Sequence, residues 1–201
     1  MARPREFDEQ SVLTAAQDVF RRQGYGGATV SDLTEATGLG KSSLYGAYAS
    51  KHGLYLAALD DYRGRKVEAL QHDLEIDEAA IAKLRSMLLE VARGSTGPMP
   101  SCMLNGAATE LSDHDASVGD RVTSAFCDLA TLLAETVRAA QDQGDVDADA
   151  DAGAVADALL AISRGIDVLG HGGLERDRLE RAIDATLEAF AGNATPGKHL
   201  L

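Results

Sequence analysis

The sequence has little of what stabilises small secreted proteins or builds membrane proteins. Its 201 residues include two cysteines, four prolines and no tryptophan. Two cysteines exclude a disulfide-based scaffold. The absence of any run of about 18 apolar residues predicts that no segment spans a membrane. The N-terminus lacks the apolar stretch of a signal peptide, and we therefore expect a cytoplasmic protein.

The chain is instead rich in residues that form helices and bury surface. Its hydrophobic content is 45%, and Ala, Leu, Val and Ile recur with helical spacing along most of its length. This composition excludes a disordered chain, because enough apolar surface is present to build a core. With so few prolines, the pattern predicts an all-α protein of one or two domains.

Charged and aromatic residues are unevenly distributed along the chain. Residues 1–55 hold six of the 19 Lys and Arg and six of the 32 Asp and Glu, so the net charge of −13 comes from the remainder. Seven of the nine aromatic residues lie before residue 63. A neutral, tyrosine-rich region therefore precedes an acidic, alanine-rich one, and this asymmetry predicts two functional parts.

Three short helices are expected at the N-terminus. An amphipathic pattern predicts the first over residues 8–23, ending at Gly24. Thr29 and Asp32 have the spacing of a capping box at the start of the second helix, which Gly38 ends. A third helix begins near residue 41, and Ser50 is expected to cap a long helix over residues 51–73.

Two short helices joined by a glycine-containing turn and packed on a longer one form a helix-turn-helix. The second helix of this motif fits the major groove of DNA. Small residues allow close approach, and hydroxyl groups and lysine donate hydrogen bonds to phosphates and base edges. The alternative is that three small helices simply cap a bundle. The second helix of the motif is the one that begins near residue 41, and its exposed face has no acidic residue. This face comprises Gly40, Lys41, Ser42, Ser43, Tyr45 and Gly46.

Residues 28–59, ATVSDLTEATGLGKSSLYGAYASKHGLYLAAL, resemble the DNA-binding region of TetR-family transcriptional regulators. The preceding VLTAAQDVFRRQGYGGAT resembles the family's first helix. The resemblance implies a helix-turn-helix DNA-binding domain over residues 1–50 and a helical regulatory and dimerisation domain over residues 51–201, with 51–73 as a linker helix. Gly46-Ala47 departs from the family pattern, which has an aromatic residue or His there, and this leaves the base-reading pattern open.

The resemblance also implies which part of the DNA individual residues contact. Arg3 and Arg5 form either an arm that reaches the minor groove or a basic tail. Base contacts are implied for Gly40, Lys41 and Ser42. Phosphate contacts are implied for Thr29, Lys41, Ser43, Tyr45 and Lys51.

Further helices are expected over residues 78–93, 101–111, 118–143, 152–169 and 174–191. Each of the last two has a large apolar stripe and a second stripe of small residues, Ala158, Ala161 and Gly165 on one and Ala182, Ala185 and Ala189 on the other. Two apolar faces need two partners, so the stripes form either a two-fold dimer interface or an intramolecular core. The resemblance implies a homodimer on a near-palindromic DNA operator and favours an interface of Leu159, Ile162, Ile166, Leu179, Ile183, Leu187 and Phe190.

The resemblance also implies a pocket for a small-molecule effector whose binding releases the DNA. A weakly polar line beside apolar neighbours suits such a pocket, although the same residues also suit an ordinary core. The candidate lining residues are Met87, Cys102, Met103, Asn105 and Phe126. Cys102, at a predicted helix start, is either reactive or an inert buried residue. The alternative function is a helical small-molecule-binding or thiol-reactive sensor protein of similar fold in which Cys102 is the sensing group.

Catalytic and metal-binding patterns are missing from the sequence. The alternating acids over residues 145–151 lack the glycine and glutamate that a calcium loop requires. The five histidines form no zinc motif, and no nucleophile elbow occurs. We therefore expect no catalytic residue, metal or cofactor, and a repressor that an effector releases from its operator.

Overall fold

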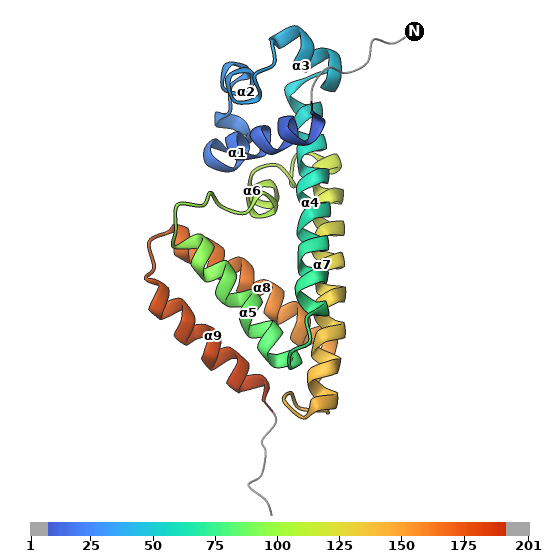
Figure 1. Cartoon of the computed structure of the whole chain (residues 1–201), viewed down its shortest axis with the longest axis vertical. Helices are drawn as coiled ribbons and strands as arrows, with labels where there is room; N and C mark the ends of the chain where they lie inside the picture. The colour runs from blue at the N-terminus through green and yellow to red at the C-terminus, as the bar shows by residue number, and fades with distance from the viewer. Residues whose placement is uncertain (1–7, 192–201) are drawn as a thin grey trace, which may run out of the picture. The chain divides into compact units, whose positions relative to one another are not determined.

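The computed structural model describes residues 8–191, which form helices and no strand (Figure 1), as the all-α prediction requires. No helix in this range combines the length and the apolar character needed to cross a bilayer. The helices are α1 (Glu9–Gly27), α2 (Val30–Thr37), α3 (Lys41–Tyr48), α4 (Lys51–Glu75), α5 (Ala80–Ser95), α6 (Met103–Glu110), α7 (Ala116–Gln143), α8 (Ala152–His171) and α9 (Arg176–Phe190).

The predicted helix boundaries rest on local hydrogen bonds that the structure contains. The N–H of Thr29 donates to the Asp32 carboxylate (2.9 Å), and the N–H of Asp32 donates to the Thr29 hydroxyl (3.1 Å), which completes the capping box of α2. Gly38 ends this helix in the left-handed conformation. Gly24 interrupts the first helix where its end was predicted, with φ of 72° and ψ of 170°, and a short helical segment then continues to Gly27.

The chain divides into two compact units that are not continuous in sequence. Unit 1 comprises Met1–Lys66 and Pro100–Ala125, and unit 2 comprises Val67–Met99 and Phe126–Leu201. The compact units therefore do not follow the expected division at residue 50, since α6 clusters with the N-terminal helices. That functional boundary stays a prediction.

Unit 1 has a core of leucine and aromatic side chains. Helix α1 packs on both α2 and α6. Leu33 of α2, Leu44 of α3 and Leu54 of α4 are fully buried. The ring of Phe20 meets Tyr55 edge-on at 4.9 Å between centroids. The tyrosines of the N-terminal region therefore contribute to packing as well as to the surface.

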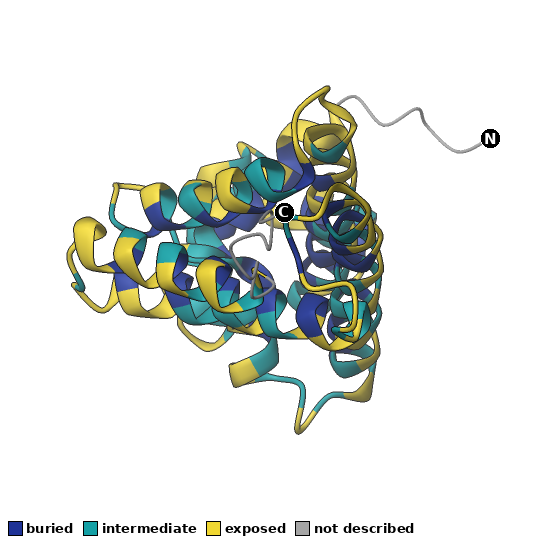
Figure 2. Ribbon diagram, turned by 90° about the horizontal axis from the view of Figure 1, so that it is seen from below, coloured by how far each residue is buried: buried dark blue, intermediate teal, exposed yellow. Residues whose placement is uncertain are grey.

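Unit 2 is built around α5, which packs against both α8 and α9. Figure 2 shows the resulting alternation of buried and exposed stripes along the helices. The large apolar stripes of α8 and α9 are largely buried within this single chain, where both helices pack against α5. Ile162 and Phe190 are half-buried and stay interface predictions. The other five residues of the expected interface are already buried in one chain, so their part in a dimer contact also stays a prediction: Leu159, Ile166, Leu179, Ile183 and Leu187.

The small-residue stripes of α8 and α9 lie on the outside of unit 2. Ala161 on α8 is exposed, as are Ala182, Ala185 and Ala189 on α9. At the end of α8, Val168 and Leu169 are 60% and 52% exposed. The second apolar face of each helix is therefore the one that this chain leaves uncovered, and we call it the outer alanine face.

Candidate nucleic-acid interface

Helix α3 has one buried face and one exposed face. Leu44 and Tyr48 are 0% and 8% exposed and anchor the helix in unit 1. The side chains that project outward are short or donate hydrogen bonds, and the first turn has no acidic residue. Tyr45 is half-buried, and the exposed positions are Lys41, Ser42, Ser43 and Gly46.

The N-terminus of α3 has the properties of an anion-binding site. Gly40 is the N-cap residue and supplies no side-chain hydrogen bond to the first turn. Backbone N–H groups and the positive end of the helix dipole therefore face outward, where they attract phosphate. Lys41 adds a positive charge there, and its Nζ lies 5.8 Å from the centroid of the Tyr45 ring.

A tight turn joins α3 to α4 and places Lys51 at the start of α4. Ala49 takes a positive φ of 64°. The Ser50 hydroxyl accepts a hydrogen bond from the N–H of Gly53 (3.0 Å), as predicted for a capping residue. A Cβ on Gly53 would lie 2.0 Å from the carbonyl oxygen of Tyr48, so the two helices approach closely only because residue 53 is glycine.

Lys51 and Thr29 occupy the starts of two further helices in unit 1. The Nζ of Lys51 lies 4.4 Å from the centroid of the Tyr25 ring, which is a cation–π contact. Thr29 is exposed at the N-cap of α2. All eight residues predicted to bind DNA therefore belong to unit 1, whereas Arg3 and Arg5 lie outside the described residues.

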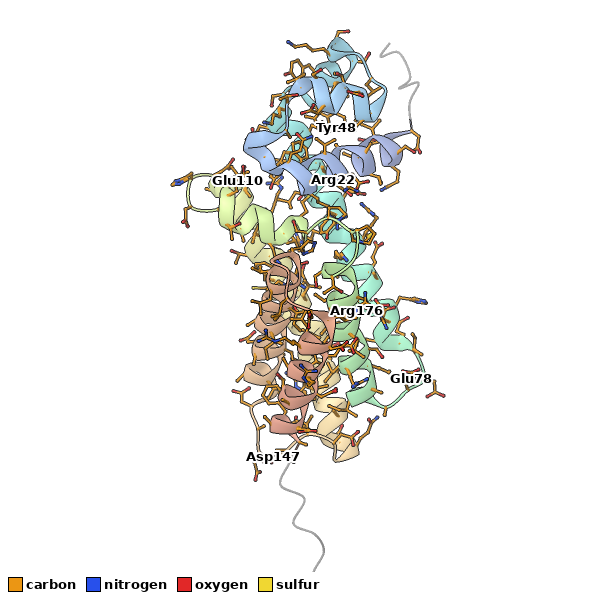
Figure 3. All side chains as sticks on the ribbon, turned by 90° about the vertical axis from the view of Figure 1, so that its left-hand side faces the viewer. Arg22, Tyr48, Glu78, Glu110, Asp147 and Arg176 are labelled. Carbon is orange, nitrogen blue, oxygen red and sulfur yellow. The ribbon has the colours of Figure 1, made fainter. Side chains whose placement is uncertain are left out.

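Charged side chains connect the N-terminal helices to the segment that contains α6. The Arg21 guanidinium donates to the carbonyl oxygens of Ser101 (2.8 Å) and Pro100 (2.5 Å). Glu110, labelled in Figure 3, accepts hydrogen bonds from the N–H groups of Tyr25 (2.7 Å) and Gly26 (2.6 Å). Sequence reasoning missed these contacts, because their partners are about 80 residues apart and no local pattern pairs them.

Two side-chain contacts tie α4 to the chain around the start of α7. The Nε2 of His52 lies 3.4 Å from the Asp115 carboxylate, and Arg121 donates to Asp60 at 2.8 Å. Hydrogen bonding by the Ser117 hydroxyl is the main factor that lowers the pKa of Asp115. In the capping box, hydrogen bonds from Thr29 lower the pKa of Asp32.

The five candidate effector residues are divided between the two units. Met103 is buried, and Cys102 and Asn105 are half-buried with it at the start of α6 in unit 1. Met87 on α5 and Phe126 on α7 are half-buried in unit 2. A separate cleft of about 290 Å³ in unit 2 is lined by residues of α4, α5 and α7, and none of the five candidates lines it.

Cys102 lies in a contact network with two residues of unit 1. The Tyr62 hydroxyl donates to its sulfur at 3.7 Å, and Arg21 stacks over the Tyr62 ring at 5.4 Å. Burial raises the pKa of Tyr62 well above its ordinary value, so the hydroxyl keeps its proton. Within residues 8–191, no His, Cys, Asp and Glu side chains gather in a way that would hold a metal ion.

Comparison with known proteins accounts for both parts of the chain. The model of bacterial regulatory proteins of the tetR family matches residues 12–58. The model of the tetracyclin repressor-like C-terminal domain matches residues 80–190. An uncharacterised HTH-type transcriptional regulator, YezE of Bacillus subtilis, is 27% identical over 94% of this chain and all of its own length. The HTH-type transcriptional repressor ComR of Escherichia coli is 26% identical over 94% of this chain and 91% of its own.

Solved structures agree with this result. A cysteine-substituted variant of the TetR-family regulator CifR, complexed with 26-base-pair operator DNA, aligns with a TM-score of 0.80 and 30% identity. The alignment covers 94% of this chain and all of that one. The reduced form of NemR from Escherichia coli has the same fold, with a TM-score of 0.79 over 88% of this chain and 93% of its own, at 15% identity. The chain therefore belongs to the TetR family of transcriptional regulators, whose members are not enzymes.

Proposed function

We propose that this protein is a transcriptional repressor that binds a near-palindromic DNA operator as a homodimer and leaves it when a small molecule binds. One observation carries the proposal. The exposed face of α3 has only small or hydrogen-bond-donating side chains and no acid, above the buried anchors Leu44 and Tyr48. ComR is named as a repressor, and CifR was solved on operator DNA. DNA binding also suggests a cytoplasmic location.

The residues of unit 1 have separate roles in this proposal. Helix α3 enters the major groove, where short side chains allow its backbone to approach the base edges. Gly46 lies on the face of α3 that enters the groove. The base edges are contacted by Gly40, Lys41 and Ser42, and phosphates by Thr29, Lys41, Ser43, Tyr45 and Lys51.

The outer alanine face of α8 and α9 supplies the dimer contact in this proposal. Small side chains let helices from two chains approach closely, and a two-fold axis makes one patch complementary to itself. Ile162 and Phe190, half-buried in one chain, become fully buried at the edge of this contact. Two copies then present two α3 helices to two half-sites, which is why the operator is near-palindromic.

We propose two candidate positions for the effector, one within each unit. Cys102, Met103 and Asn105 are weakly polar candidates at the start of α6 in unit 1, and Met87 and Phe126 are apolar candidates within unit 2. An effector releases DNA only if it binds the released conformation more tightly than the DNA-bound one.

Footprinting tests the proposed function. The DNA upstream of the protein's own gene is incubated with the purified protein at about 150 mM salt, where non-specific binding is weak. We expect protection of two half-sites in successive turns of the groove. If neither this DNA nor a random-sequence selection yields a preferred site, the protein is not a sequence-specific regulator.

Two matched variants test whether residues of unit 1 make the DNA contacts. Lys51→Ala should weaken binding and reduce the dependence of log Kd on log salt by about one, because one phosphate contact is lost. Arg138→Ala removes the same charge from an exposed position on α7 in unit 2 and should leave the slope unchanged. Equal slopes for the two variants would contradict the assignment of Lys51 to the interface.

A thiol-reactive sensor is a second candidate, and the surroundings of Cys102 favour it. Its sulfur touches the Tyr62 hydroxyl, and Arg21 binds both the Tyr62 ring and the carbonyl groups of residues 100 and 101. An adduct on Cys102 has to displace Tyr62, and this disturbs the link between Arg21 on α1 and the carbonyl groups that precede α6. The CifR structure was solved with cysteines substituted, and NemR was solved in its reduced form.

N-ethylmaleimide tests the thiol function. Native protein is treated briefly, modified cysteines are located by mass spectrometry, and operator binding is measured. The expected result is loss of binding on modification of Cys102 in a Cys127→Ser protein, while Cys102→Ser binds DNA before and after treatment. If Cys102 stays unmodified while the exposed Cys127 reacts, the thiol function is wrong.

A further inference from the structure

The kink in α1 presents two consecutive backbone N–H groups to one carboxylate. At Gly24 the backbone leaves the helical conformation, with φ of 72° and ψ of 170°. Beyond it, the N–H of Tyr25 donates to one oxygen of Glu110 (2.7 Å) and the N–H of Gly26 donates to the other (2.6 Å). Hydrogen bonds to a charged acceptor are stronger than neutral ones, so this pair fixes the backbone at Tyr25 firmly.

The contact with Glu110 also explains why residues 24 and 26 are glycines. A Cβ on Gly24 would lie 3.0 Å from a carboxylate oxygen of Glu110, and a Cβ on Gly26 would lie 3.1 Å from the other oxygen. A Cβ on Gly27 would meet only the Cβ of Gln23 at 3.6 Å, an ordinary contact. Gly24 and Gly26 therefore make room for the Glu110 side chain, and Gly27 does not.

The side chain of Tyr25 carries this link onward to α4. Its ring lies edge-on to Tyr55 with 4.9 Å between centroids, and the ammonium of Lys51 lies 4.4 Å from its centroid. The electron-rich face of the ring attracts the cation and restricts where Lys51 points. Tyr25 thus connects Glu110 on α6 with Lys51 at the start of α4, all within unit 1.

We propose that Glu110 is a positioning residue for DNA binding. By fixing Tyr25, it holds the Lys51 ammonium where it contacts a phosphate of the operator. Operator affinity then depends on a residue of α6 that is not among those expected to touch DNA. The inference rests on the phosphate contact of Lys51 in the proposed function.

Gly26→Ala is the primary test, because a Cβ 3.1 Å from a Glu110 oxygen crowds the carboxylate out of its position between the two N–H groups by a few tenths of an ångström and keeps its charge. Glu110→Ala also removes a negative charge that repels DNA, so its two effects oppose each other. We expect Gly26→Ala to weaken operator binding by about three- to fivefold, the range of an exposed cation–π contact. The matched control Gly27→Ala should bind like the parent protein. Equal affinity for Gly26→Ala and Gly27→Ala would overturn the proposal.

A double-mutant cycle distinguishes positioning from a general effect on folding. In a Lys51→Ala background, Gly26→Ala should cause no further loss of affinity, and Gly26→Ala alone should move the salt slope towards that of Lys51→Ala. The same loss in both backgrounds would show that Gly26 and Glu110 act through the fold, and would overturn the proposal.

The cycle also separates two kinds of failure. If Lys51→Ala changes neither affinity nor slope, the phosphate contact itself is wrong, and the positioning role is wrong with it. If Lys51→Ala weakens binding but Gly26→Ala does not, only the positioning role fails. Glu110→Ala, measured in both backgrounds, provides a second variant should Gly26→Ala lose helicity.

Discussion

The two units of this chain differ in the contacts that stabilise each of them internally. In unit 1, charged groups bridge segments that are distant in sequence, because Arg21 binds backbone carbonyls just before α6 and Glu110 binds backbone N–H groups of α1. In unit 2, aliphatic side chains such as Leu84 and Ile183 fill the space between α5, α8 and α9. The ion pair between Arg85 and Asp184 (2.8 Å) lies at the surface there.

The difference corresponds to what each unit has to do. Directional hydrogen bonds fix the orientation of helices, and DNA recognition requires several helix ends at fixed positions. Aliphatic packing stabilises helices without fixing orientation so strictly, because hydrophobic cores tolerate volume-conserving exchanges. In the proposed dimer, unit 2 mainly has to be a stable support for the outer alanine face.

The largest effect we predict is on the core of unit 2. Leu159→Ala removes a fully buried side chain of α8, which packs against α5, and should lower the free energy of unfolding by about 2–5 kcal/mol. Urea denaturation followed by circular dichroism measures it. Unchanged stability together with loss of the dimer would mean that this stripe forms the interface after all.

The opposite face of α8, which includes Ala161, gives a different prediction from that of Leu159. Ala161→Glu places a charge on the outer alanine face, and the two-fold axis brings its copy nearby. We expect monomers in analytical ultracentrifugation and about 100-fold weaker operator binding, because the second half-site no longer benefits from linkage. Ala139→Glu, at an exposed position on α7, is the control and should remain dimeric. Monomers from both variants would show that the added charge acts generally.

Local patterns predicted the fold well, because their physical causes are local. The capping box at Thr29 and Asp32, the left-handed Gly38 and the Ser50 cap each involve residues close in sequence. The motif around α3 likewise identified the family, since DNA contact demands particular residues at particular positions. Helical periodicity then predicted the remaining elements.

Contacts between distant segments were not predictable in the same way. The pairing of Glu110 with Tyr25 depends on how α6 packs against α1, and no spacing in the sequence encodes that. The two stripes of α8 are visible in the sequence, but large side chains suit a core and an interface equally. Only the packing of α8 on α5 and the full burial of Leu159 in one chain favour a core role for the large stripe.

A smaller prediction concerns the DNA-facing surface of unit 1. A Cβ on Gly46 would meet nothing within 4 Å, so the chain itself does not require glycine there. Gly46→Ala should raise the stability of the helix by about 0.5–1 kcal/mol. It should nevertheless weaken operator binding by about tenfold, if the groove approaches this position more closely than a methyl group allows.

Helix α6 offers the matched control for this substitution. Gly106 is also exposed, also has open space around its Cβ position, and also lies in an eight-residue helix of unit 1. Gly106→Ala should increase thermal stability in the same way and leave operator affinity unchanged. If both variants bind more tightly, the small face of α3 is not a contact surface.

Acid should affect unit 1 first, and this is the smallest effect that we predict. Hydrogen bonds from Thr29, Ser117 and Ser11 lower the pKa values of Asp32, Asp115 and Asp8, respectively, below the ordinary value of 3.8. A carboxyl group whose pKa is lower in the folded state stabilises the fold above its unfolded pKa, and this stabilisation is lost as pH falls through the folded value.

The tyrosines allow this prediction to be tested for unit 1 separately, because all five precede residue 67 and therefore lie in unit 1. Below about pH 4, the near-ultraviolet circular dichroism of tyrosine should decrease while far-ultraviolet helicity is still largely retained, since the shifted carboxyl groups are then becoming protonated. Asp115→Asn should reduce the separation between the two transitions, because it removes one of the three groups. If the two signals change together at every pH, the units unfold as one, and the contrast between directional contacts and aliphatic packing does not extend to stability.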